Sequence, residues 1–203
     1  MEFREVVRKR RMVRRFEQRS VPRETIDRLL DTARRGPSAG FSQGSDFVVL
    51  DRPKTIARFW EITTDPRWPM EEEELAAGPT VLVLLFSDKR RYLARYSEPD
   101  KAEFGLQEEG AWPVPFWDTD TAMAGMLLLL AAVNEGLGGW YFGLDYGEAE
   151  LRRELRVPDD RRLVGLIGLG FPDPEETPTG SWAVKRRRPL EEMVHRNGWT
   201  TSA

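Results

Sequence analysis

The sequence has 203 residues, with 31 lysines and arginines, 34 acidic residues, a formal net charge of -3, one histidine and no cysteine. This length predicts one domain with a sizeable core. The acidic balance argues against a general nucleic-acid binder, and the lack of cysteine excludes disulfides, thiolate metal sites and cysteine nucleophiles. One histidine, His195, argues against a histidine-rich metal site or a serine–histidine triad, and we expect it to be structural.

The first half of the chain reads as short helices and apolar strands. Apolar spacing predicts a helix over residues 2–11, and the following MVRRFEQRSV breaks that period and predicts extended chain. A second stripe at helical spacing ends at Gly36-Pro37, which is a typical helix stop. Further on, the pattern predicts a strand at 47–50, a helix at 54–62, a polar excursion at 65–75 and a strand covered on both faces at 80–86.

The second half begins with a long loop, residues 97–117, which contains three prolines and several aromatic residues. Loops of this length in compact domains are usually functional. The stretch AMAGMLLLLAAV, residues 122–133, is too short to span a bilayer and predicts a helix buried all round, from near Asp118 or Thr119 to Gly136. We then expect a strand at 138–144, a helix at 148–155, a strand at 162–172 and a polar, irregular tail after Pro174.

The elements alternate in a mixed α and β pattern without repeats. No signal peptide is visible, and we expect a cytoplasmic protein without a membrane or nucleic-acid partner. The chain has no dinucleotide or phosphate-loop fingerprint, and Glu71 to Glu74 read as a solvated face. An enzyme built on this sequence would therefore need an organic cofactor.

Three segments stand out, namely RRMVRRF at residues 10–16, GPSAGFSQ at 36–43 and KRRRPLEEMVH at 185–195. With the Ala- and Leu-rich stretch at 122–138, their order and spacing resemble the nitroreductase family of FMN-dependent oxidoreductases. That family carries Arg-Arg-Ser-x-Arg-x-Phe, Pro-Ser-x-x-Asn-x-Gln-Pro-Trp and a Lys-x-Arg-x-Pro-type segment at the matching places. The chain departs from these motifs at Met12, Phe41 and Gly44-Ser45.

The resemblance implies an α+β sandwich, with a mostly antiparallel sheet wrapped by helices, in a domain-swapped homodimer. Residues 1–203 would form one FMN-binding domain, and residues 174–203 would be a C-terminal extension that reaches the partner subunit. Two FMN sites would lie at the interface, each built from both chains.

The resemblance also implies the roles of individual residues. Arg10 and Arg11 would hold the FMN phosphate from one side, beside Met12, and Lys185 and Arg187 would close from the other. Arg14 would reach the pyrimidine edge of the ring, and the strand end at Phe142, Gly143 and Leu144 would offer a backbone N–H to flavin N5. The residues expected against the ring are Pro37, Ser38, Ala39, Gly40 and Gln43. Those expected at the substrate are Phe41, Trp112, Phe116 and Trp117.

The implied function is transfer of electrons from NAD(P)H through FMN to a small acceptor such as a nitroaromatic or a quinone, with no catalytic side chain required. Two alternatives stay open: a relative that destroys its own flavin to make a benzimidazole, and a flavin-binding protein without turnover. A nucleic-acid-binding arm is a third reading, disfavoured by the acidic charge. For the aromatic loop, the alternative is that its rings close the core around the start of the long helix.

Overall fold

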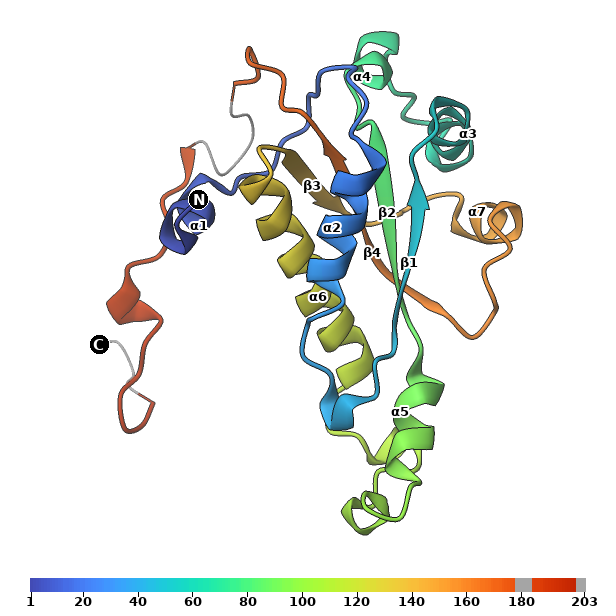
Figure 1. The fold of residues 1–203 in the computed structure, drawn as a ribbon, viewed down its shortest axis with the longest axis vertical. Coiled ribbons are helices and arrows are strands. Elements are labelled where there is room, and N and C mark those ends of the chain that lie inside the picture. Colours follow the sequence, from blue (N-terminus) through green and yellow to red (C-terminus); the bar gives the residue numbers. More distant parts are fainter. Residues whose placement is uncertain (178–183, 200–203) are drawn as a thin grey trace.

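The computed structural model describes residues 1–177 and 184–199. It contains a four-stranded antiparallel sheet with the strand order β1-β2-β4-β3 (Figure 1). The strands are β1 (Ser45–Leu50), β2 (Val81–Ser87), β3 (Gly138–Phe142) and β4 (Arg162–Gly170). The α+β class and all four predicted strands are confirmed.

Helices cover both faces of this sheet (Figure 1). On one face lie α2 (Arg23–Ala33) and α6 (Phe116–Asn134), which bury Leu29 and Leu128 against Val83, Leu85 and other residues of the first core cluster. On the other lie α3 (Pro53–Thr63) and α7 (Glu148–Glu154), which bury their apolar residues against the alternate positions of β2. Because successive side chains of a strand point to opposite faces, β2 is buried along its whole length, as predicted.

The long helix α6 differs from the prediction of burial all round. It begins at Phe116, two residues before Asp118, and it leaves Met123 and Met126 exposed by 50% and 42%. Helix α1 (Phe3–Lys9) packs beside α6 and exposes Phe3 and Val7. We call these exposed apolar side chains of α1 and α6 the α1–α6 face.

By length and composition alone, helix α6 is long and apolar enough to cross a membrane. The apolar stretch identified in the sequence, residues 122–133, is shorter and, taken alone, too short to do so. One such helix is weak support for a span, because the core helix of a globular domain passes the same test. Here the helix packs against α2 and all four strands.

Two helices were not predicted. The polar excursion contains α4 (Glu72–Ala76), which starts with a capping box in which the side chain of Glu74 accepts the backbone N–H of Glu71 at 3.2 Å. Helix α5 (Lys89–Tyr96) precedes the long loop, and Asp88 caps it by accepting the backbone N–H of Arg90. The acidic run thus remains exposed, but it also starts a helix.

The described part of the C-terminal tail, residues 184–199, extends away from the sheet and its helices (Figure 1). It contains one short turn of helix and exposes large apolar side chains, among them Val184, Leu190, Met193 and Trp199. The ring of His195 stacks on that of Trp199, with 4.1 Å between centroids, which fits a structural role. An extension that reaches a partner subunit stays a prediction.

Candidate functional site

The basic segment, residues 10–16, is extended as predicted and runs beside strand β3. The backbone N–H of Val13 donates to the carbonyl of Gly139 at 3.0 Å, and Met12 forms a parallel bridge with the same glycine. The side chain of Val13 is buried against Gly138, where an added Cβ would lie 2.8 Å from it. This close approach explains why glycine starts β3 and fixes which way the basic segment faces.

Side chains alternate along an extended chain, so those of the basic segment divide into two sets. Arg11 and Val13 line one small cavity of about 220 Å³. Arg10, Met12 and Arg14 therefore belong to the opposite set. The sulfur of Met12 accepts the backbone N–H of Tyr141 at 3.4 Å, so this donor on the edge strand β3 has a partner. Within residues 1–177 and 184–199, the guanidinium groups of Arg10 and Arg14 have no ion pair.

Arg11 is engaged differently. Its guanidinium pairs with the carboxylate of Glu176, whose side chain is only 7% exposed, and the same carboxylate accepts the backbone N–H of Arg14 at 2.7 Å. The phosphate contact expected of Arg11 stays a prediction, and this ion pair counts against it. Glu176 was missed because it lies in a polar stretch without periodicity, 165 residues from its partner.

The end of β3 provides a free backbone donor. Strand pairing stops at Phe142, whose ring stacks with Trp140 and Trp60 on the α3 side of the sheet. The N–H of Gly143 makes no backbone hydrogen bond within the described chain, and no atom lies within 4 Å of where its Cβ would be. Leu144 packs on the second core cluster. Of the three predicted strand-end residues, Gly143 is thus the one that is open to a ligand.

The turn at residues 38–43 has an unusual backbone. Gly40, Phe41 and Gln43 all have positive φ, at 60°, 59° and 52°. This conformation is strained for a residue with a side chain and persists only where its surroundings hold it. Phe41 projects from the turn with 76% of its surface exposed.

Side-chain hydrogen bonds hold the backbone of the turn. The backbone N–H of Ala39 donates to Asp120 at 2.9 Å, and that of Gln43 donates to the hydroxyl of Ser38 at 2.6 Å. The guanidinium of Arg95 donates to the carbonyl of Gly40 at 2.9 Å. Pro37 precedes this turn and separates it from α2. The turn is therefore preformed, which suits a surface that presents Phe41 to a ligand.

Asp120 is the buried anchor of this turn and was not predicted as such. Besides Ala39, it accepts the hydroxyl of Tyr92 at 2.9 Å, and Tyr92 is fully buried. Burial raises the pKa of the Tyr92 phenol above its usual value. The sequence showed Asp120 only as an acid near a helix start.

We predict that Tyr92→Phe lowers the free energy of unfolding by about 1–3 kcal/mol, because Asp120 loses a buried donor. Since the folded pKa of Tyr92 is raised, its contribution is complete below about pH 10 and is lost as the pH rises through the folded pKa. Denaturant titrations between pH 8 and 11 should show this alkaline loss in the parent chain and less of it in Tyr92→Phe. An equal loss in both would contradict the assignment.

The aromatic loop packs against the same tyrosine. Trp112 and Trp117 are 8% and 5% exposed, and both rings meet Tyr92 edge to face. Phe116 is partly buried beside them. The structure therefore favours the alternative in which these rings close the core, and their contact with a substrate stays a prediction. Phe41 remains exposed, as does Phe104 of the loop.

We predict that Trp112→Ala destabilises the fold by about 3–5 kcal/mol, the usual cost of removing a buried aromatic side chain. Phe104→Ala, which removes a ring that is 56% exposed, is the matched control and should cost far less. Thermal unfolding of both variants measures the difference. A Trp112→Ala variant as stable as the control would place that ring outside the core.

The basic segment, residues 10–16, and the turn at residues 38–43 lie at opposite ends of α6 (Figure 1). The turn at 38–43 is bound to Asp120 near the start of the helix, whereas the basic segment lies at Gly138 and Gly139, after its end. From Asp120 to Asn134 the helix rises about 20 Å. One chain therefore does not bring Arg14 and the turn at 38–43 together against one flavin ring. Lys185 and Arg187 are exposed and without an ion pair in the described chain, so their phosphate contact stays a prediction.

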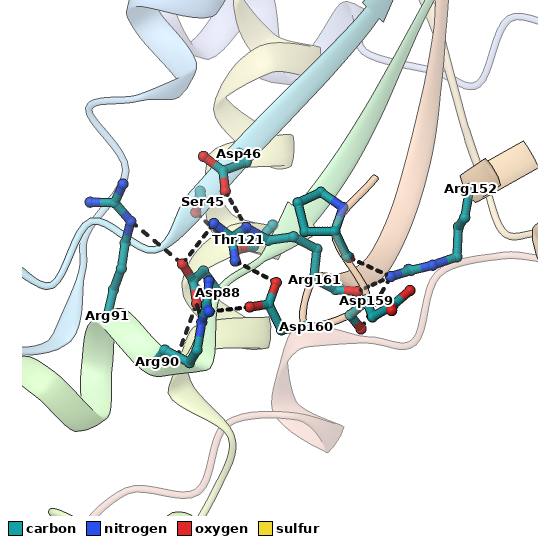
Figure 2. A network of polar contacts seen from close by, with 11 residues as sticks. Ser45, Asp46, Asp88, Arg90, Arg91, Thr121, Arg152, Asp159, Asp160 and Arg161 are labelled. Atoms are coloured by element: carbon teal, nitrogen blue, oxygen red, sulfur yellow. Dashed lines mark hydrogen bonds and ion pairs between the residues drawn. The ribbon is translucent and has the colours of Figure 1, made fainter. Parts of the chain in front are cut away.

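A second charged cluster is satisfied internally (Figure 2). Arg161 pairs with Asp46 at 2.7 Å, with Asp88 at 3.0 Å and with Asp160 at 2.9 Å. These ion pairs tie β1 to the loops before α5 and β4. The cluster is a poor anion site, because the acids neutralise the guanidinium of Arg161. Across residues 1–177 and 184–199, no group of three acidic or histidine side chains could hold a metal ion.

Comparisons with known proteins agree with the motif reading. The profile of the Nitroreductase family matches residues 7–171. A Methanothermobacter thermautotrophicus protein provisionally named NADH dehydrogenase/NAD(P)H nitroreductase is 26% identical, over 85% of this chain and 78% of its own. An iodotyrosine deiodinase of Nematostella vectensis is 25% identical, over 95% and 74%. The solved structure of an FMN-dependent nitroreductase from Clostridium difficile superposes with a TM-score of 0.67 at 19% identity, covering 96% of this chain and 98% of that one.

Proposed function

Because the chain belongs to the nitroreductase family, we propose that it is an NAD(P)H-dependent FMN oxidoreductase that reduces a small aromatic or quinone-like acceptor. The main support for this proposal is a group of hydrogen-bond donors beside β3. Among residues 1–177 and 184–199, the guanidinium groups of Arg10 and Arg14 form no ion pair and project from one side of the basic segment. In the same part of the chain, the N–H of Gly143 at the strand end makes no hydrogen bond. Cations and an N–H donor are what an anionic flavin requires.

The residues present fit FMN. A guanidinium can donate two parallel hydrogen bonds to a phosphate, which suits Arg10. Arg14 would face the pyrimidine edge of the ring, where one unit charge at ~4 Å and an effective dielectric of ~20 contributes about 4 kcal/mol before desolvation. Gly143 would donate to N5. When bound, FMN supplies the electron-transfer chemistry, and the chain supplies binding, orientation and electrostatics.

The site would be completed by a second copy of the chain. The α1–α6 face leaves Phe3, Val7, Met123 and Met126 uncovered, and soluble proteins rarely expose large contiguous apolar patches without a partner. Packing of two such faces would bring the turn at 38–43 of one chain towards the basic segment of the other. We therefore propose a homodimer with two composite sites. In it the C-terminal extension, residues 174–203, reaches the partner only beyond Glu176, because the side chain of Glu176 binds Arg11 and Arg14 of its own chain.

The acceptor would bind against the exposed face of the flavin, with Phe41 as a wall. An aromatic ring on a preformed turn offers flat apolar area to a flat substrate. The resemblance to iodotyrosine deiodinases raises reductive dehalogenation of an aromatic ring as a second candidate reaction, with iodide as its product. Cytoplasmic location, and the lack of nucleic-acid and membrane partners, also belong to the proposal.

Titration of the purified chain with FMN tests the proposal. We expect saturation at one FMN per chain, with the two visible absorbance bands of a bound flavin. The acceptor is then tested with a nitroaromatic, a quinone and an iodophenol, with iodide release measured for the last. A chain that takes up no FMN at micromolar concentration would contradict the proposed function.

A further inference from the structure

The carboxylate of Glu176 makes three contacts with the basic segment. It is buried, it pairs with the guanidinium of Arg11, and it accepts the backbone N–H of Arg14 at 2.7 Å and, weakly, that of Arg15 at 3.4 Å. A single side chain thus fixes both the backbone and one cation of the segment. Each of these bonds is charge-assisted, and such bonds are about twice as strong as neutral ones.

The neighbouring backbone strengthens this arrangement. Phe16 bridges Pro172 in antiparallel fashion, Glu17 donates its N–H to the carbonyl of Phe171 at 2.9 Å, and Asp173 donates to that of Arg15 at 3.1 Å. Residues 171–176 therefore run against residues 14–17. Glu176 lies at the end of this pairing, among the first residues of the C-terminal extension.

We propose that Glu176 is a positioning residue for the flavin site, an inference that rests on the proposed function. It acts in two ways. Its bond to the N–H of Arg14 fixes the backbone from which Arg14 projects towards the flavin. Its ion pair neutralises Arg11, so that Arg11, on the opposite side of the segment from Arg10 and Arg14, adds no net positive charge near the flavin.

Two substitutions separate these roles. In Glu176→Gln the amide oxygen can still accept the N–H of Arg14, but the negative charge is gone and Arg11 is unneutralised. We expect the flavin midpoint potential to rise and FMN affinity to be kept, because an added positive charge stabilises the anionic reduced flavin. In Glu176→Ala the acceptor is lost too, and FMN affinity should fall about tenfold as the segment loosens.

The double variant Arg11→Gln/Glu176→Gln restores the net charge, and its midpoint potential should return to the parent value. Asp173→Asn is the matched control, because it removes an acid from an exposed pair with Arg15 in the same stretch. It should change neither affinity nor potential. If Glu176 only stabilised the fold, Glu176→Gln would not raise the potential and the double variant would not restore it, and this result would overturn the proposal.

Amide hydrogen exchange, measured on the protein without FMN, tests the role of Glu176 independently of whether the chain binds FMN. The amides of Arg14 and Arg15 should exchange several-fold faster in Glu176→Ala than in the parent chain, and nearly as slowly in Glu176→Gln. Equal protection in all three would overturn the positioning role even if FMN binds. Failure of the parent chain to bind FMN, with the exchange pattern as expected, would contradict the proposed function and leave the backbone role of Glu176 supported.

Discussion

Met126→Glu should convert the protein to a monomer that no longer retains FMN. Met126 lies on the α1–α6 face with 42% of its surface exposed, so the single chain should tolerate the change. In a dimer the new carboxylate would be buried without a partner, and such a charge costs several kcal/mol at each of the two symmetric positions. Cofactor binding would fail with the dimer, because one chain holds the two motif segments at opposite ends of α6.

Sedimentation and bound-FMN absorbance of the same sample measure both effects. Leu75→Glu is the matched control, since Leu75 is an apolar residue of similar exposure, 40%, on α4 outside the α1–α6 face. It should leave the dimer and its FMN intact. A Met126→Glu monomer with full FMN content would show that one chain suffices, and the composite site would then be wrong.

Arg10→Ala and Arg14→Ala should fail in different ways. Removing Arg10 deletes a charge-assisted contact to phosphate of about 1.5–3 kcal/mol, which weakens FMN binding about 10- to 150-fold. Removing Arg14 should lower the flavin midpoint potential, because the reduced, anionic ring loses its counter-charge. A net change of 1.4 kcal/mol corresponds to about 30 mV in a two-electron couple.

Arg15→Ala is the control for both variants, because Arg15 lies in the same segment but is exposed and paired with Asp173. It should change neither FMN affinity nor potential. Equal losses of affinity in Arg10→Ala and Arg14→Ala, with the potential unmoved, would remove Arg14 from the edge of the ring.

Local patterns predicted most of the fold. The apolar run of β2 and the helix α2 follow from periodicity, and the structure confirms both, with α2 ending at Ala33, three residues before Gly36. Helix α4 was missed because its five residues are mostly acidic and carry little apolar periodicity. The exposed methionines of α6 could not be predicted either, because the helix is apolar all round and only its packing shows which side is left uncovered.

The residues of the candidate site were also predicted only in part. Arg10, Arg14 and the turn at 38–43 were found because they form motifs that are contiguous in the sequence. Glu176 and Asp120 were missed because their roles depend on partners 165 and 81 residues away. Trp112 looked like a loop residue at a substrate, but its ring is buried against Tyr92.

Anaerobic titration of the FMN-loaded protein with NADH and NADPH tests the central claim most directly. We predict that one of the two bleaches the flavin band at one equivalent per site. The band should then return when a nitroaromatic or quinone acceptor is added without oxygen. Bound FMN that neither nucleotide reduces would contradict the account and favour a flavin-binding protein without turnover.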